Sequence, residues 1–155
     1  MKILRPLPGT TIAVTAAALA LAGLTAGPAR AVGHDHLETF VNQSTGLCLE
    51  GLGSGVIRTS SCAGVSTQKW SVHVRSDGTR QLTNARTGQC LADRHTSGLR
   101  THPCDGGTSQ RWVVHGRSNG TVELRNRETQ RCVEGSAGFG ARTSRCDGGS
   151  FQSWY

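Results

Sequence analysis

The chain has 155 residues, of which 17 are Lys or Arg and 10 are Asp or Glu, and aromatic residues make up only 5%. A length of this order suits one small domain. The basic residues are spread along the chain and form no Lys- or Arg-rich run, which argues against nucleic acid as a partner.

The first 31 residues have the pattern of a secretory signal peptide. Lys2 and Arg5 give a basic start, an apolar run covers residues 11–24, and Ala29-Arg30-Ala31 supplies a small-x-small cleavage pattern. The apolar run is shorter than the roughly 20 residues of a membrane span, so we expect no membrane span. Cleavage after Ala31 gives a secreted chain of residues 32–155, which keeps 14 of the 17 basic residues and has a net charge of about +4.

Three copies of one unit account for nearly all of this secreted chain. The motif Gln-x-Trp recurs at a shift of 42 residues, as Gln68-Lys69-Trp70, Gln110-Arg111-Trp112 and Gln152-Ser153-Trp154. The same shift, without a gap, superimposes the Asn residues Asn42, Asn84 and Asn126, and the Arg residues Arg58, Arg100 and Arg142. A fixed period of this length is typical of a repeat architecture. We therefore expect one domain over 32–155, with repeats at about 34–75, 76–117 and 118–155.

Each repeat reads as short strands separated by turns. Ser76-Asp77-Gly78-Thr79 and Ser118-Asn119-Gly120-Thr121 are hairpin signals, and the residues before them alternate between apolar and polar. No window shows a helical stripe. Three repeats of about four strands predict an all-β fold, a β-trefoil barrel with pseudo-threefold symmetry. The expected core is Phe40, Leu49, Ile57, Trp70, Leu82, Leu91, Leu99, Trp112, Leu124, Val133 and Trp154.

Six cysteines in a short exported chain indicate disulfides rather than metal ligands or a reactive thiol. Their number alone does not give the pairing. A core shared among equivalent units favours the same bridge in each repeat, which predicts Cys48–Cys62, Cys90–Cys104 and Cys132–Cys146. Each bridge closes a loop of about 15 residues and is worth on the order of 3 kcal/mol.

Three Gln-x-Trp motifs, each preceded by two cysteines, make the chain resemble the ricin B-type (R-type) lectins, which also occur as carbohydrate-binding modules. The resemblance implies one shallow sugar site per repeat. A carboxylate two residues after the first Cys accepts bonds from sugar hydroxyls, and an aromatic residue two before the second Cys stacks on the sugar ring. A polar residue, usually Asn, precedes the Gln of Gln-x-Trp.

Carried over position by position, this pattern is incomplete in every repeat. The carboxylate position holds Glu50, Ala92 and Glu134, and the stacking position holds Ser60, His102 and Ser144. The residue before Gln is Thr67, Ser109 or Phe151. Asp93 is the only carboxylate beside Ala92, and Phe151 is a ring that can approach the third site from another direction. The carbohydrate-binding candidates are Glu50, Thr67, Gln68, Asp93, His102, Ser109, Gln110, Glu134, Phe151 and Gln152. The three Gln residues also have a purely structural interpretation, since Gln-x-Trp holds this fold together through side chain to backbone hydrogen bonds.

Arg58, Arg100 and Arg142 lie four residues before the second Cys of each repeat. Strand alternation puts them on the same face as the stacking position. They are either solvated strand arginines or contacts for an anionic partner, such as a uronate- or phosphate-bearing polymer or an acidic protein surface.

A second motif depends on signal cleavage. If Val32 is the first residue, Val32-Gly33-His34 offers an amine, two amide nitrogens and an imidazole, a set that suits Cu(II) or Ni(II). Any chain with His in third place qualifies, so we expect no resident metal and no cofactor.

An enzyme finds little support in the sequence. Once the disulfides form no Cys is free, and neither a nucleophile elbow nor a zinc motif is present. We expect a monomeric, secreted, non-catalytic binding module, most simply for a glycan or polysaccharide. The alternative is an extracellular protein partner, with the trefoil serving as an adaptor in a secreted complex or as an enzyme inhibitor.

Overall fold

The computed structural model describes residues 36–155, which form short strands and three single 3-10 turns. The predicted signal peptide and the Val32-Gly33-His34 motif lie outside the described residues. The strands are β1 (His36–Glu38), β2 (Cys48–Gly51), β3 (Ile57–Ser60), β4 (Trp70–Val74), β5 (Arg80–Asn84), β6 (Cys90–Arg94), β7 (Gly98–His102), β8 (Trp112–Gly116), β9 (Val122–Asn126), β10 (Cys132–Ser136) and β11 (Gly140–Ser144). The 3-10 turns are η1 (Ser66–Gln68), η2 (Thr108–Gln110) and η3 (Ser150–Gln152). Within residues 36–155, no helix is long and apolar enough to cross a membrane.

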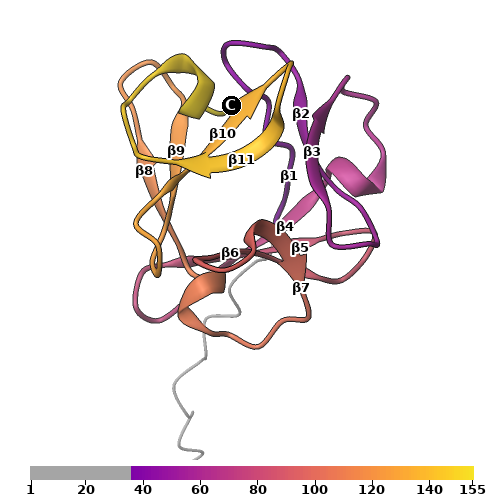
Figure 1. Cartoon of the computed structure of the whole chain (residues 1–155), viewed down its shortest axis with the longest axis vertical. Helices are drawn as coiled ribbons and strands as arrows, with labels where there is room; N and C mark the ends of the chain where they lie inside the picture. The colour runs from indigo at the N-terminus through magenta and orange to yellow at the C-terminus, as the bar shows by residue number, and fades with distance from the viewer. Residues whose placement is uncertain (1–35) are drawn as a thin grey trace, which may run out of the picture. The chain divides into compact units, whose positions relative to one another are not determined.

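A closed ring of strands forms the barrel (Figure 1). The hairpins β4–β5 and β8–β9 are antiparallel, β1 pairs with β4, and β5 pairs with β8. Trp154 closes the ring, because it bridges to Val122 of β9 on one side and to Asn42 on the other. The first and last repeats therefore meet edge to edge, as the predicted β-trefoil requires.

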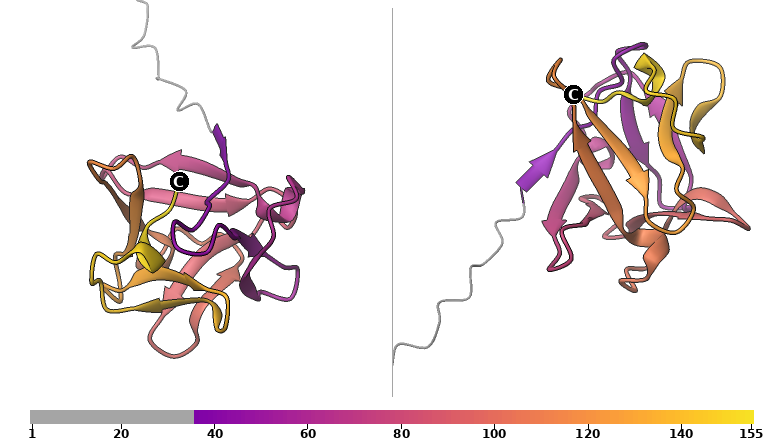
Figure 2. Two further views of the ribbon diagram at one scale, coloured as in Figure 1. Left: turned by 90° about the horizontal axis from the view of Figure 1, so that it is seen from above. Right: turned by 90° about the vertical axis from the view of Figure 1, so that its left-hand side faces the viewer.

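Three further hairpins, β2–β3, β6–β7 and β10–β11, belong one to each repeat (Figure 2). Their registers are equivalent, with Cys48 opposite Ser60, Cys90 opposite His102 and Cys132 opposite Ser144. Each hairpin is followed by its 3-10 turn. The sequence period is thus a structural period, and equivalent residues occupy equivalent places in the three hairpins.

The two predicted turns connect β4 to β5 and β8 to β9. The backbone N–H of Thr79 donates to Asp77 Oδ1 at 3.0 Å, and that of Thr121 donates to Asn119 Oδ1 at 3.1 Å. Gly78 lies at φ 80°, a value that residues with a Cβ rarely adopt. The Asp-Gly and Asn-Gly pairs therefore set these turns, as the sequence predicted.

The predicted core is confirmed, with one difference. Three Trp side chains are fully buried, and around them pack Phe40, Leu49, Ile57, Leu82, Leu91, Leu124 and Val133. Leu99 is only partly buried and packs against this cluster from outside. Each hairpin thus contributes to one shared interior.

All three predicted disulfides are present. Cys48–Cys62, Cys90–Cys104 and Cys132–Cys146 each join Cα atoms 5.1 Å apart. No cysteine among the described residues is free. Each bridge ties the first strand of a hairpin to the loop after the second strand, directly beside the positions that the sequence assigns to sugar binding.

Gly135 on β10 allows the closest approach between a hairpin and the barrel. A Cβ at this position lies 2.6 Å from Trp154 Cη2 and 3.0 Å from Thr59 Cγ2. Both atoms belong to well-packed surroundings, so there is no space for a methyl group.

Gly135→Ala is expected to lower the free energy of unfolding by about 1–3 kcal/mol through overpacking. Urea denaturation measures this change. Gly138→Ala, in the turn of the same hairpin, is the matched control, because a Cβ there has no neighbour within 4 Å. Equal stability of the two variants contradicts the close approach of Gly135 to Trp154.

Candidate functional site

The carboxylate position and the arginine position face each other across every hairpin. Glu50 is opposite Arg58, Ala92 is opposite Arg100, and Glu134 is opposite Arg142. Directly opposite side chains on antiparallel strands are close enough to interact. The arginines and the candidate sugar-binding acids therefore form one site in each repeat, and its content differs among the three.

In repeat 1 the Glu50 carboxylate is fully engaged inside the protein. Its Oε2 accepts from Arg58 Nε at 2.7 Å and Ser60 Oγ at 2.8 Å, and its Oε1 accepts from Thr67 Oγ1 at 2.7 Å. Glu50 is only 6% exposed. Burial raises its pKa, but the hydrogen bonds from Thr67, Arg58 and Ser60 outweigh burial and hold the pKa below its ordinary value. The site of repeat 1 is closed.

In repeat 3 the equivalent carboxylate is held in a similar way but borders an open hollow. Glu134 Oε1 accepts from Arg142 Nη2 at 2.8 Å, and Ser144 Oγ donates to Oε2. The hydrogen bond from Ser144 lowers the pKa of Glu134, and the bonds from Arg142 and Gln152 lower it further against the effect of burial. The hollow has a volume of about 510 Å³ and is lined by Glu134, Ser144, Arg145, Cys146 and Asp147.

Phe139 and Phe151 are exposed aromatic side chains of repeat 3 near its candidate site. Phe139, in the β10–β11 turn, is 73% exposed, and the guanidinium of Arg142 lies 4.8 Å from its ring centroid. Phe151 stands where repeat 1 has Thr67, and is 47% exposed on η3, which packs against β10. Arg142 therefore links Phe139 to Glu134. Sequence reasoning missed Phe139, although a lone aromatic between two glycines in a hairpin turn is an available signal.

In repeat 2 the site has no carboxylate of its own. Ala92 is fully buried, and the imidazole of His102 stands at the place of Ser60 and Ser144. His102 Nε2 is buried without a hydrogen-bond partner among residues 36–155. Burial lowers the pKa of His102, and the charges of Arg94 and Arg100 lower it further, while Asp105 opposes them.

Asp93 is turned away from this site. It is fully buried, and its carboxylate accepts hydrogen bonds from Thr129 Oγ1 and, at 2.8 Å, from Thr143 Oγ1, both in repeat 3. Arg131 Nε lies 3.5 Å from its Oδ2. Adjacent strand residues point to opposite faces, so Asp93 joins repeats 2 and 3 and does not replace the carboxylate missing at Ala92.

The three Gln residues of Gln-x-Trp serve the fold. Gln110 Oε1 accepts from Asp105 N at 2.9 Å, and its Nε2 donates to Pro103 O at 2.8 Å. Gln68 and Gln152 hold the corresponding loops in the same way. Both ends of each amide are occupied by neighbouring groups, as the structural interpretation of the motif predicted.

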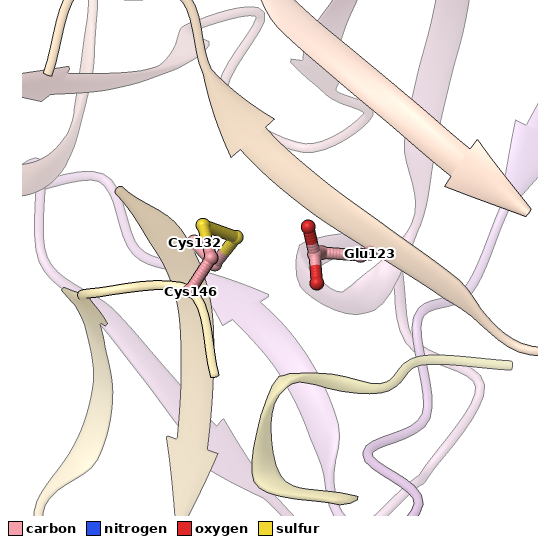
Figure 3. Close-up of side chains that lie close together, drawn as sticks. All are labelled: Glu123, Cys132 and Cys146. Atoms are coloured by element: carbon pink, nitrogen blue, oxygen red, sulfur yellow. A yellow bond between two sulfur atoms is a disulfide. The ribbon is translucent and has the colours of Figure 1, made fainter. Parts of the chain in front are cut away.

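Glu123 lies beside the Cys132–Cys146 bridge (Figure 3). Both sulfur atoms are bonded to each other, so neither is a thiolate that can bind a metal. The Glu123 carboxylate accepts instead from Arg117 Nη2. Arg117 also donates to Gly148 O at 2.6 Å, and so ties β9 to the loop of repeat 3. The group is a structural contact.

The fold and the three Gln-x-Trp motifs, whose Gln side chains bind neighbouring backbone groups, define a β-trefoil of the lectin class. The family described as ricin-type beta-trefoil lectin domain-like matches residues 30–97 and 66–144, and the chain belongs to this family. No curated protein matches the chain by sequence.

Solved structures with the same fold share little sequence with this chain. ThreeFoil, a designed threefold-symmetric protein, has a TM-score of 0.70 at 20% identity, over 76% of this chain and 95% of its own. An exo-β-1,3-galactanase from Clostridium thermocellum gives 0.68 at 19%, over 75% of this chain and 28% of its own. The hemolytic lectin CEL-III gives 0.62 at 23%, over 76% of this chain and 29% of its own. The chain thus spans less than a third of the galactanase and of CEL-III.

Glu50 and Glu134 accept hydrogen bonds as carboxylates, so the change in the free energy of unfolding at low pH tests the site. Because the folded-state pKa values of Glu50 and Glu134 lie below the ordinary 4.5, their stabilisation is complete above the unfolded-state pKa. It is lost as the pH falls through the folded-state pKa. The double variant Glu50→Gln/Glu134→Gln is expected to be less stable at pH 7 and to lose less stability between pH 7 and 3. Urea denaturation across this range measures the slope, and equal slopes contradict the engaged carboxylates.

Proposed function

We propose that this chain is a secreted, non-catalytic carbohydrate-binding protein and that the third repeat holds the sugar. The observation that carries the proposal is the hollow of about 510 Å³ beside Glu134. It lies at the place where R-type lectins bind sugar, and Arg142, which pairs with Glu134, also contacts the exposed ring of Phe139. The family and the three disulfides support a binding module in an oxidising, extracellular environment.

Polar groups at the hollow suit sugar hydroxyls. Asp147 Oδ1 accepts from Gly149 N at 2.7 Å, which leaves Oδ2 as an acceptor. Arg145 forms no ion pair with any residue in 36–155, and this residue is exposed. A carboxylate next to a guanidinium supplies the acceptors and donors that vicinal hydroxyls need.

The aromatic surface replaces the stacking residue that Ser144 does not provide. Phe139 has one face against Arg142 and is otherwise exposed, and Phe151 offers a second ring. Aromatic faces cover the C–H groups of a sugar ring. The first repeat lacks both rings, and its acid is already saturated, so we assign it no sugar.

A protein partner is the second candidate, and a separate observation favours it. A hollow of about 280 Å³ lies at the barrel mouth, lined mainly by apolar side chains, among them Phe40, Val72, Leu82 and Val114. Tyr155 at its edge is 58% exposed. Apolar surface of this kind suits a protein contact.

Val114→Glu is expected to abolish such a contact without changing sugar binding.

Phe139→Ala is expected to weaken binding of lactose and β-1,3-galactan up to about tenfold, the value of one aromatic contact. These galactose probes follow from the galactanase among the similar structures. Titration calorimetry and affinity electrophoresis measure the change, and thermal melting checks that the variant is folded.

Glu134→Gln is the companion variant, with Glu50→Gln as its matched control. Loss of galactose binding in Glu134→Gln but not in Glu50→Gln assigns the sugar to repeat 3. Binding that survives both Glu134→Gln and Phe139→Ala contradicts the proposed site.

A further inference from the structure

The three repeats hold different groups at one equivalent position. In repeats 1 and 3, a Glu carboxylate lies between the hairpin strands and is bound by the Arg opposite it, Arg58 at 2.7 Å and Arg142 at 2.8 Å. In repeat 2 the residue is Ala92, and Arg100 faces its methyl group instead. Repeats 1 and 3 therefore show that this position accepts a carboxylate, and repeat 2 does not supply one.

Two of the three donors that hold the carboxylate in repeat 1 have counterparts in repeat 2. Arg100 corresponds to Arg58, and Ser109 corresponds to Thr67, whose hydroxyl donates to Glu50 at 2.7 Å. Ser109 is nearly buried, and its hydroxyl makes no hydrogen bond within the described part of the chain. Repeat 2 thus has two of the three donors, has His102 in place of the third, and lacks the carboxylate acceptor.

Arg100 is exposed and has no carboxylate partner among residues 36–155. The described ion pairs include Arg58 with Glu50 and Arg142 with Glu134 but none that involves Arg100. The nearby Arg94 is paired with Asp105 at 3.3 Å. The charge at this hairpin is therefore positive and uncompensated at Arg100, whereas the equivalent charges in repeats 1 and 3 are neutralised.

His102 gives independent support. Its Nε2 is buried without a partner in the described part of the chain, and a buried polar atom left unsatisfied costs free energy. The imidazole stands at the place of Ser60, which donates to Glu50 Oε2 at 2.8 Å. A carboxylate bound here provides an acceptor beside this ring.

We propose that repeat 2 binds the carboxylate of an acidic sugar, a uronate, in the role that Glu50 and Glu134 play in the other repeats. Arg100 and the Ser109 hydroxyl are the donors, and His102 borders the site. The choice of a sugar rests on the proposed carbohydrate-binding function. The choice of a carboxylate rests on the two internal examples, because Arg pairs well with its planar geometry.

The test uses residues 32–155 with the disulfides intact and a trigalacturonate probe, followed by titration calorimetry and by NMR of the His102 ring. Arg100→Gln is expected to weaken binding by at least about tenfold. Arg58→Gln is the matched control and is expected to leave binding unchanged, since Arg58 is held by Glu50.

A second variant fills the position from within. Ala92→Glu combined with His102→Ser copies the residues of repeat 1 into repeat 2. The introduced carboxylate is expected to pair with Arg100 and abolish trigalacturonate binding in a folded protein. Because the introduced carboxylate gains Arg100 as a partner, we expect this double variant to fold although Ala92 is fully buried.

The outcomes separate this site from the one in repeat 3. Galactose binding without trigalacturonate binding overturns the uronate site and leaves the proposed function intact. Trigalacturonate binding that depends on Arg100, without galactose binding, overturns the assignment to repeat 3 alone. Equal binding by wild type, Arg100→Gln and the double variant, or tighter binding of a triglutamate peptide, overturns the uronate site.

Discussion

The indole N–H of each buried Trp donates to a backbone carbonyl of the hairpin in the same repeat. Trp70 bonds to Leu49 O at 3.1 Å, Trp112 to Leu91 O at 2.9 Å and Trp154 to Val133 O at 3.0 Å. The accepting residue immediately precedes the carboxylate position in every case. Because this bond is buried and joins barrel to hairpin, it fixes the strand whose next residue faces the site. The site therefore keeps its place even where its residues differ.

On this constant frame the three repeats have taken different states. The first is closed by its own Glu–Arg pair, the second has the arginine without the acid, and the third has the pair next to an open hollow. The Arg side chain of each pair is 52% exposed, so these ion pairs by themselves contribute only modestly to stability, beside the hydroxyl hydrogen bonds to the same carboxylates. Their main effect here is on which groups remain available to a ligand, so neighbouring copies of one scaffold differ in what they can bind.

Features that recur with the period could be predicted from the sequence, and features that occur once could not. The disulfides, the core and the hydrogen bonds of the Gln-x-Trp motifs follow from residues that align in all repeats. The Glu50–Arg58 pair escaped prediction because the hairpin register decides which residues are opposite, and spacing alone does not give it. Phe139 and Asp93 have no counterparts in the other repeats, so the period carried no information about them.

The buried Asp93 specifies which repeat packs against which, because it joins repeat 2 to repeat 3. Its carboxylate needs a positive neighbour in an interior of low polarity, and Arg131 supplies one from repeat 3. At the equivalent places repeat 2 has Gln89 and repeat 1 has Leu47. Because the three repeats are nearly equivalent, other arrangements compete with the native fold. In these, one repeat occupies the position of another, within one molecule or between two. Such an arrangement keeps threonines at the places of Thr129 and Thr143 but removes the positive partner of Asp93, so this single acid disfavours packing of the repeats in the wrong positions.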